Sequence, residues 1–196
     1  MKYKLTEKTI KLGSHTLYQI EALRGFGDVK KGEKGGFIER EDNLSQIGNA
    51  WVYDNACVFE NARVLDNAQV RNNAQVYGNA WICDDALVYN NAQIYNNAWI
   101  FNNAKVYGNA RIFGNARVYG NAHIFNNAQV YGDARVYGNA WVYGNASIYN
   151  RASASDDAQV YGNACVCNYS FVYGKAKVYG NLKLLGGFFY YTKQKS

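Results

Sequence analysis

The sequence contains no proline, so the chain interior keeps every backbone N–H that a strand ladder needs. It has no apolar run of the roughly 20 residues that a membrane span requires, and no apolar stretch of signal-peptide length near Met1. The four cysteines, Cys57, Cys83, Cys165 and Cys167, match no zinc-ligand spacing. Free thiols are typical of a reducing compartment. We therefore expect a cytoplasmic protein with no membrane partner and no metal site.

From Asn49 to Gly186 the chain is a run of 23 six-residue repeats without insertion or deletion, beginning NAWVYD NACVFE NARVLD. Position two is Ala in 21 hexads, position four is Val or Ile in 21, and position one is Asn or Asp in 20. A helix would spread these positions around its circumference, whereas in a strand positions two and four share one face. Small and β-branched residues suit a narrow, dry interior, so positions three and five should point outward.

The other two positions of the hexad are expected to form a corner. Gly and Asn, common at position six, tolerate a left-handed backbone conformation, and Asn at position one can stack in ladders. Three sides, or 18 residues per coil, make the simplest closed coil. At position three the same residue recurs 18 positions later in Gln75/Gln93, Trp81/Trp99 and Arg117/Arg135.

The predicted fold is therefore all-β: a triangular parallel β-helix over residues 49–186. Residues 1–48 should form an N-terminal β cap with strands on either side of Gly13. Residues 187–193 are apolar and β-prone. Because an open strand edge invites pairing, the tail 187–196 should cover the last coil as a short C-terminal cap or pair with another subunit.

Stacking at 18 residues arranges the position-three side chains in three outward columns. The first contains Trp51, Lys105 and His123, and the second contains Cys57 and Arg111. The third column reads Arg63, Trp81, Trp99, Arg117, Arg135, Ser153 and Phe171. From Ala86 to Gly132 the only formal charges are Lys105, Arg111 and Arg117, so the middle of the repeat body should be locally positive.

The third column is the main candidate for a binding surface. Two Trp on adjacent rungs, about 4.8 Å apart, precede two Arg. This pattern suits a protein interface or a nucleotide-like ligand held by stacking and phosphate contacts, but also a cation–π ladder that only stiffens the sheet. The predicted binding residues are Trp81, Trp99, Arg117, Arg135, Arg111 and Lys105.

Two further features concern the outer surface. Position five is aromatic in 17 hexads, and so much exposed aromatic area favours self-association; we expect a dimer or trimer. The hexad Arg151-Ala152-Ser153-Ala154-Ser155-Asp156 lacks both the core Val and the outward Tyr. It predicts either a locally thinner corner or a shallow recess that admits a partner or ligand.

The pattern Ala-x-Val every six residues resembles the left-handed β-helix of hexapeptide-repeat proteins. The stretch GDVKKGEKGGFIEREDNLSQIGNAWVYDNA resembles the entry segment of YdcK-type and related phage or prophage hexapeptide proteins, many of which are named acyltransferases. The resemblance implies a left-handed coil, often a homotrimer, and in the acyltransferases a catalytic His with acyl-CoA as donor. This sequence has no loop between hexads, and its only histidines are His15, in the N-terminal segment, and His123, at position three.

We therefore interpret the chain as a non-catalytic binding or scaffolding solenoid that needs no cofactor. The resemblance suggests a phage or prophage protein that binds a host protein or a small nucleotide-like ligand through its flat faces; inhibition of a host defence is one role of this kind. We do not expect nucleic acid as a partner. The alternative is an acyltransferase that uses acyl-CoA, with His123 as the candidate catalytic base.

Overall fold

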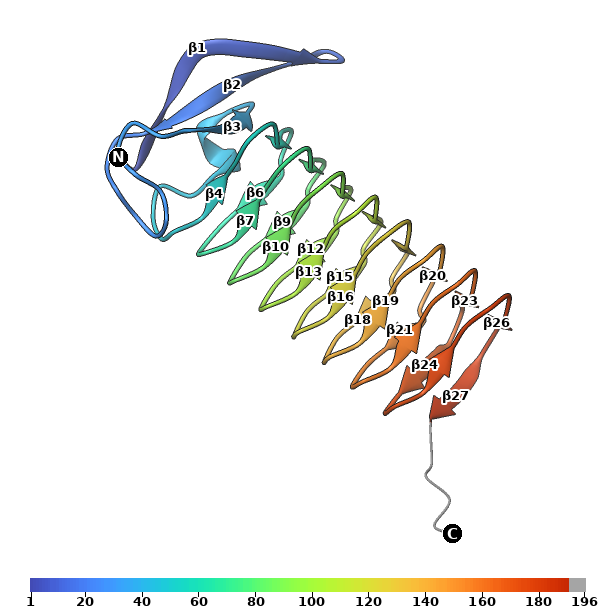
Figure 1. Ribbon diagram of the computed structural model, residues 1–196. Helices are drawn as coiled ribbons and strands as arrows, with labels where there is room; N and C mark the ends of the chain where they lie inside the picture. The colour runs from blue at the N-terminus through green and yellow to red at the C-terminus, as the bar shows by residue number, and fades with distance from the viewer. Residues whose placement is uncertain (191–196) are drawn as a thin grey trace.

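The hexads form a straight parallel β-solenoid with three sides, as the computed structural model shows for residues 1–190 (Figure 1). Each coil contributes one short strand to each of three sheets. The strands between residues 51 and 166 each pair in parallel with the strand 18 residues further on, as in Trp81↔Trp99 and Arg117↔Arg135. The predicted coil of 18 residues is confirmed. The left-handed coil remains an expectation from the resemblance.

The three sheets are named here for use below. The long sheet has eleven strands in the order β1-β2-β3-β5-β8-β11-β14-β17-β20-β23-β26. Its bounds are β1 (Tyr3–Leu12), β2 (His15–Ala22), β3 (Lys34–Ile38), β5 (Cys57–Val58), β8 (Gln75–Val76), β11 (Gln93–Ile94), β14 (Arg111–Ile112), β17 (Gln129–Val130), β20 (Ser147–Ile148), β23 (Cys165–Val166) and β26 (Lys183–Leu184).

The other two sheets have eight strands each. The His123 sheet contains β4 (Trp51–Val52), β7 (Gln69–Val70), β10 (Leu87–Val88), β13 (Lys105–Val106), β16 (His123–Ile124), β19 (Trp141–Val142), β22 (Gln159–Val160) and β25 (Lys177–Val178). The Trp81 sheet contains β6 (Arg63–Val64), β9 (Trp81–Ile82), β12 (Trp99–Ile100), β15 (Arg117–Val118), β18 (Arg135–Val136), β21 (Ser153–Ala154), β24 (Ser170–Tyr173) and β27 (Gly187–Tyr190). A 3-10 helix, η1 (Glu41–Asn43), precedes the first coil.

The interior is built from positions two and four of the hexads. Along the solenoid the Ala and the Val or Ile at these positions are almost completely inaccessible to solvent, as at Ala116 and Val118. Backbone hydrogen bonds join each rung to the next: from Trp99 to Asn103, the amides of Trp99, Phe101 and Asn103 donate to the carbonyl groups of Ala116, Val118 and Gly120 at 2.9–3.1 Å. The predicted interior is therefore confirmed.

The corners follow from position six. Every residue at this position from Asp54 to Gly180 has a positive φ, which is the left-handed region that Gly, Asn and Asp tolerate best. At Gly114 an added Cβ would lie 2.8 Å from the amide nitrogen of Gly132, so the stacking of coils also limits side-chain size there. Asn side chains at position one form the predicted ladders, as in Asn79 to Asn97 and Asn97 to Asn115, both at 3.0 Å.

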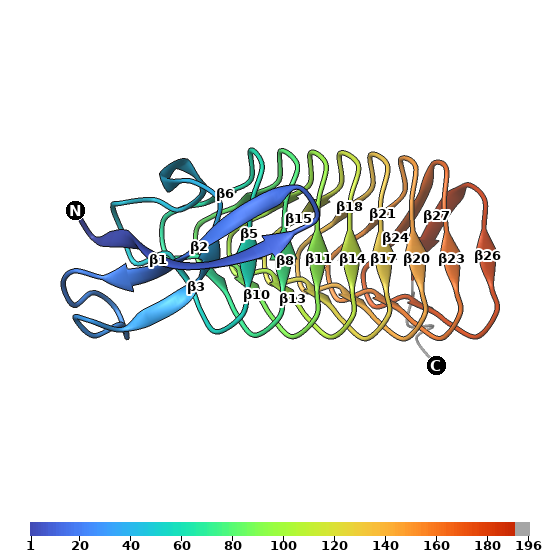
Figure 2. The ribbon, with the colours of Figure 1, turned by 90° about the horizontal axis from the view of Figure 1, so that it is seen from above.

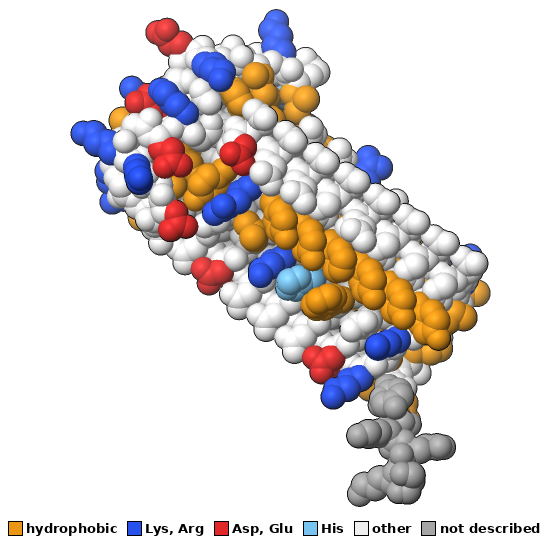
Figure 3. Space-filling view, viewed as in Figure 1, with side chains coloured by type: hydrophobic (Ala, Val, Ile, Leu, Met, Phe, Trp, Pro, Cys, Tyr) orange, Lys and Arg blue, Asp and Glu red, His pale blue; other side chains and the backbone are white. Residues whose placement is uncertain are grey.

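Position five builds aromatic ladders on the outer surface. The His123 sheet carries six stacked rings, Tyr89, Tyr107, Phe125, Tyr143, Tyr161 and Tyr179, with centroids 4.7–5.3 Å apart. A second ladder of six rings runs from Phe59 to Tyr149 on the long sheet. A continuous band of hydrophobic side chains along the solenoid is visible in Figure 3. These rings cover the sheet and stiffen it, because each ring stacks on both neighbouring rungs.

The N-terminal segment covers part of the outer surface as well as the end of the solenoid. Strands β1 and β2 form an antiparallel hairpin around Gly13, as expected, and β3 joins the solenoid in parallel with β5. Figure 2 shows the hairpin lying over β5 and β8, where Leu17 packs in one cluster with Cys57 and Phe59.

Two side chains that we predicted in outward columns are for this reason buried. Trp51 is 0% exposed and Cys57 is 6% exposed. The Trp51 ring lies between Tyr3 and Phe26, with centroids at 6.1 and 5.3 Å. The outward direction predicted from the hexad does not imply exposure where another segment of the chain lies on the sheet.

At the other end, β27 pairs in parallel with β24 and extends the Trp81 sheet by one rung. Residues 191–196 of the expected C-terminal cap lie outside the described residues. Among residues 1–190, no helix has the length and apolar character needed to cross a membrane.

We predict that truncating a single core side chain lowers the stability of the solenoid substantially. Ile112→Ala should lower the free energy of unfolding by about 2–5 kcal/mol, because Ile112 is 0% exposed and its truncation leaves a cavity. Urea unfolding followed by circular dichroism measures the change. Arg111→Ala, on the same strand but facing outward, should change it by less than about 0.5 kcal/mol; equal losses for both variants would contradict the inward assignment of position four.

Candidate functional site

The structure brings together four of the six predicted binding residues. Trp81, Trp99, Arg117 and Arg135 occupy successive rungs of the Trp81 sheet. Arg111 lies on the long sheet, where its Nε donates to Gln93 Oε1 at 3.1 Å. Lys105 lies on the His123 sheet. The six residues therefore cannot form one binding surface, and the candidate site is narrowed to the Trp81 sheet.

The tryptophan pair in this sheet is closed by arginines at both ends. The rings of Trp81 and Trp99 stack with centroids 5.4 Å apart and planes inclined by 12°. Arg63 lies over Trp81 at 5.9 Å and Arg117 lies over Trp99 at 5.4 Å. Because both outer ring faces are covered by guanidinium groups, the pair is a cation–π ladder, and only its edges remain open to a partner.

A recess opens further along the same sheet, at the hexad that breaks the repeat. Ser153 replaces the large side chain found at position three on the neighbouring rungs, and it is 7% exposed. The recess has a volume of about 510 Å³. Its lining consists of Asn115, Arg117, Tyr119, Asp133, Arg135, Tyr137, Arg151, Ser153, Tyr169 and Phe171. The structure has a hollow at this hexad, and its use by a partner or ligand stays a prediction.

One wall of the recess is a corner where the ladder of Asn and Asp side chains at position one ends. Asn115 Nδ2 donates to Asp133 Oδ1 at 2.9 Å, but the next two rungs carry Arg151 and Tyr169 in place of Asn. Arg151 pairs with Asp133 at 3.9 Å and donates to the Tyr169 hydroxyl at 2.8 Å. We did not predict Arg151, Asp133 or Tyr169 as site residues. The signal in the sequence was the loss of Asn or Asp at position one in two consecutive rungs of a single corner.

The electrostatics of the recess favour an anion. Arg117, Arg135 and Arg151 contribute three guanidinium groups, whereas Asp133 is the only carboxylate in the lining. Within residues 1–190, neither Arg117 nor Arg135 forms an ion pair with a carboxylate. All three arginines are exposed at the rim. Guanidinium groups arranged in this way are suited to planar, bidentate recognition of phosphate or carboxylate.

His123, the candidate catalytic base, lies on a different sheet from the recess. Its ring stacks on Trp141 with centroids 5.4 Å apart and meets Tyr107 edge-on at 6.2 Å. Burial, together with the charge of Lys105, lowers the pKa of His123. No ion pair to a carboxylate orients this ring within the described part of the chain. A general base requires such an orienting partner and a bound substrate, so His123 fits an aromatic ladder better than a catalytic centre.

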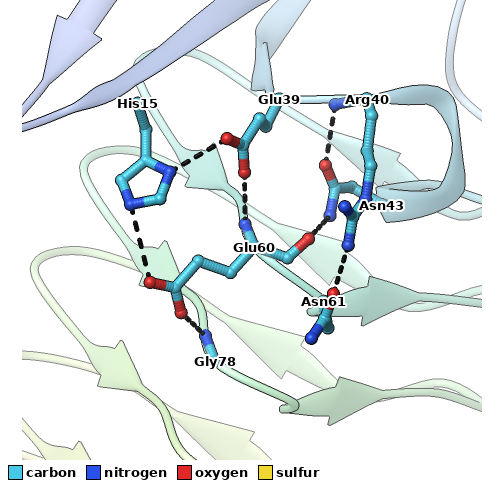
Figure 4. A network of polar contacts seen from close by, with 7 residues as sticks. All are labelled: His15, Glu39, Arg40, Asn43, Glu60, Asn61 and Gly78. Carbon is cyan, nitrogen blue, oxygen red and sulfur yellow. Dashed lines mark hydrogen bonds and ion pairs between the residues drawn. The ribbon is translucent and has the colours of Figure 1, made fainter.

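His15 has the partners that His123 lacks, and Figure 4 shows how they lie. Its Nδ1 is 2.9 Å from Glu39 Oε1 and its Nε2 is 3.6 Å from Glu60 Oε1. Glu39 Oε2 accepts the Glu60 amide at 2.6 Å, and Glu60 Oε2 accepts the Gly78 amide at 2.7 Å. Both ring nitrogens are engaged, so His15 links the hairpin to Glu39 and to Glu60, and Glu60 in turn bonds the next coil at Gly78.

Glu60 is the one glutamate at a position-six corner, and its φ is 56°. This left-handed conformation is unfavourable for a long side chain. The contacts to Glu39 and Gly78 hold it there, since both its amide and its carboxylate are used. We name the group His15, Glu39 and Glu60 the hairpin clasp.

The hairpin clasp should weaken in acid. Burial raises the pKa of Glu39, but the hydrogen bonds from His15 and from the Glu60 amide lower it by more, and the net pKa lies below its ordinary 4.5. A carboxyl group whose pKa is lowered by folding stabilises the fold above its ordinary pKa and loses this contribution as the pH falls through its folded pKa. The window is therefore below pH 4.5.

We predict that Glu39→Gln reduces hydrogen-exchange protection of the β2 amides at pH 7, and that the variant and the wild type converge below about pH 4.5. Comparing the two proteins at each pH cancels the intrinsic pH dependence of exchange. Glu41→Gln, on the neighbouring 3-10 helix, serves as the matched control and should leave β2 unchanged. A constant difference between Glu39→Gln and wild type from pH 7 to pH 3 would show that ionisation of Glu39 is irrelevant to the clasp.

One group of side chains has the proximity of a metal site but not its chemistry. Asp66, Cys83 and Asp84 place ligand atoms within 4.8 Å of one another. The Asp66 carboxylate already accepts the backbone amide of Asp84 at 3.2 Å, and the Asp84 carboxylate accepts the backbone amide of Asn102 at 2.9 Å. Burial, followed by the charges of Asp84 and Asp66, raises the pKa of Cys83 to about 11. A thiol must lose its proton to bind a metal, so this environment opposes binding.

Comparisons with known proteins agree with the geometry of the coils. Residues 110–126 and 128–144 match the family model described as YdcK Beta solenoid repeat. Over 38 residues the chain is 53% identical to a protein of Escherichia coli (strain K12) named "Uncharacterized acetyltransferase YdcK". This match covers 19% of the chain and 12% of the length of that relative. The resemblance to YdcK-type hexapeptide-repeat proteins is thus confirmed, and the family match lies in the coils between residues 110 and 144.

Proposed function

We propose that this protein is a non-catalytic binding body that holds an anionic group of its partner in the recess of the Trp81 sheet. The observation that carries the proposal is the arrangement of Arg117, Arg135 and Arg151 around one recess with Asp133 as the only carboxylate. Neither histidine lines this recess. The rigid stack of rungs fixes the backbone positions of the three arginines, so binding requires their side chains to be ordered but not the backbone.

The anionic partner is a phosphorylated small molecule or an acidic segment of a host protein. The resemblance of the entry segment to phage and prophage proteins supports a phage-encoded binder, and inhibition of a host defence is a role that such a binder could serve. The free thiols suit a cytoplasmic location. Exposed apolar side chains near the last rung, among them Leu185 and Phe188, support a homo-oligomer. The proposal includes no membrane, nucleic-acid or cofactor partner.

Anion binding can be tested with pyrophosphate in isothermal titration calorimetry. Replacing Arg135 and Arg151 together by Gln should weaken pyrophosphate binding about tenfold or more, because each lost charge-assisted contact is worth about 1.5–3 kcal/mol. The wild-type affinity should also fall as salt rises. Arg111 lies at position three of its hexad, as Arg135 does, but on the long sheet. Arg111→Gln is therefore the matched control and should bind pyrophosphate like the wild type. Equal affinity in all three proteins would refute the assignment of the recess.

A second candidate function is acetyl transfer, and the name of the Escherichia coli relative is the observation that favours it. The chain matches only 12% of that protein, so its activity is a proposal here. For this function His15 is the better oriented histidine, since Glu39 and Glu60 contact both its nitrogens. Incubation with acetyl-CoA and amine or sugar acceptors, followed by thiol release, tests it: we expect no turnover above the background rate. Turnover that disappears in His15→Gln or His123→Gln would reverse our preference.

A further inference from the structure

A column of flat side chains on the Trp81 sheet is interrupted by one small residue. Position three carries Trp81, Trp99, Arg117 and Arg135 on successive rungs, then Ser153, and then aromatic rings again. Phe171 follows on the next rung and stacks on Phe188 with centroids 5.0 Å apart. The interruption therefore has a flat side chain on each side, a guanidinium on one and a phenyl ring on the other.

The height of this gap matches one additional ring. Parallel strands are spaced by about 4.8 Å, so the backbones at Arg135 and Phe171, two rungs apart, are separated by about 9.6 Å. Rings stacked on neighbouring rungs elsewhere in the solenoid have centroids 4.7–5.4 Å apart. Ser153 is 7% exposed, so the neighbouring side chains must move apart to admit a flat group. Such a group would then be at stacking distance from both neighbours, as the protein's own rings are on other rungs.

The Ser153 rung lacks a ring at its other outward position as well. At position five, Phe101, Tyr119 and Tyr137 stack at 4.8 and 5.0 Å, and the ladder then stops at Ser155. It resumes on the next rung, where Tyr173 stacks on Tyr190. Phe171 has a protein ring on its Phe188 face and only a serine on the opposite rung, which leaves that ring face toward the recess.

We infer that the recess takes a nucleoside phosphate, with its base inserted over Ser153 between Arg135 and Phe171. This inference rests on the proposed function, because the same recess must bind the anionic group. A base stacks on an aromatic ring through its π-face, and a guanidinium favours the opposite face by cation–π attraction.

The rest of the recess offers groups that match such a ligand. Arg151, at the corner beside Ser153, and Arg117, one rung beyond Arg135, are in place for the phosphate. Asp133 is an acceptor for a sugar hydroxyl or a base N–H, while Asn115 supplies an amide. An acidic peptide would use the arginines but would leave the gap over Ser153 empty, and for this reason a small aromatic phosphate fits better.

The decisive variant is Ser153→Phe, which supplies the missing ring from the protein itself. Position three already accepts Phe171 on the adjacent rung, so the variant should fold with an unchanged circular dichroism spectrum and an equal or higher Tm. It should block the gap while leaving Arg117, Arg135 and Arg151 intact. Ser147→Phe makes the same substitution at position three of the long sheet and is the matched control.

The experiment measures calorimetric affinities for adenosine, guanosine, cytidine and uridine 5′-monophosphates, with ribose 5-phosphate as the probe that lacks a base. In the wild type and in Ser147→Phe, at least one nucleotide should bind about tenfold or more tightly than ribose 5-phosphate, as expected for one stacked base. In Ser153→Phe this preference should vanish, while the affinity for pyrophosphate changes by less than about twofold.

The outcomes separate the two proposals. If pyrophosphate binds through the arginines but no nucleotide exceeds ribose 5-phosphate, the nucleotide inference fails and the anion-binding function stands. If Ser153→Phe keeps the full nucleotide preference, the base does not occupy the gap over Ser153 and the inference fails. If neither pyrophosphate nor any nucleotide binds, both proposals fail.

Discussion

The hydrogen-bonded register between coils is the constraint on which the rest of this structure depends. In the body of the solenoid each strand residue pairs with the residue 18 positions further on, so an outward side chain there has a fixed neighbour of known identity above and below it. This register converts a linear repeat into columns. Arginines, rings and asparagines that are far apart in the chain become vertical stacks with a spacing set by the backbone rather than by side-chain packing.

Most of the solenoid could be predicted from the sequence, because the hexad pattern indicates which side chains face the interior and which face outward. Ala at position two, Val or Ile at position four and the corner at position six all have the predicted roles. The alignment at 18 residues followed from closing three sides, and that alone places Trp81, Trp99, Arg117 and Arg135 in one column. Local chemistry sufficed here because each coil contacts chiefly its two neighbours.

The features that we did not predict lie mostly where the solenoid contacts the N-terminal segment rather than where successive coils contact each other. Trp51 and Cys57 obey the hexad rule yet are buried, because side chains of the N-terminal segment pack on both: Tyr3 and Phe26 on Trp51, and Leu17 on Cys57. The clasp between His15 and Glu60 links residues 45 positions apart, and no repeat pattern relates them. Arg151 and Tyr169 were hidden for a different reason: as position-one residues, they belong to a corner that we treated as structural.

Regularity also indicates where function is to be sought in a solenoid of this kind. A hexad that follows the rule has its side chains committed to the neighbouring rungs, as Trp81 and Trp99 are committed to each other and to flanking arginines. Binding energy for a partner is available only where a rung leaves a neighbour unsatisfied. The hexad of Ser153 does so by removing a ring from the stack at position five and a large side chain from position three. Arg151 at its corner is engaged by Asp133 and Tyr169. A departure of this kind forfeits stacking contacts within the protein, and the ligand that we propose would restore them.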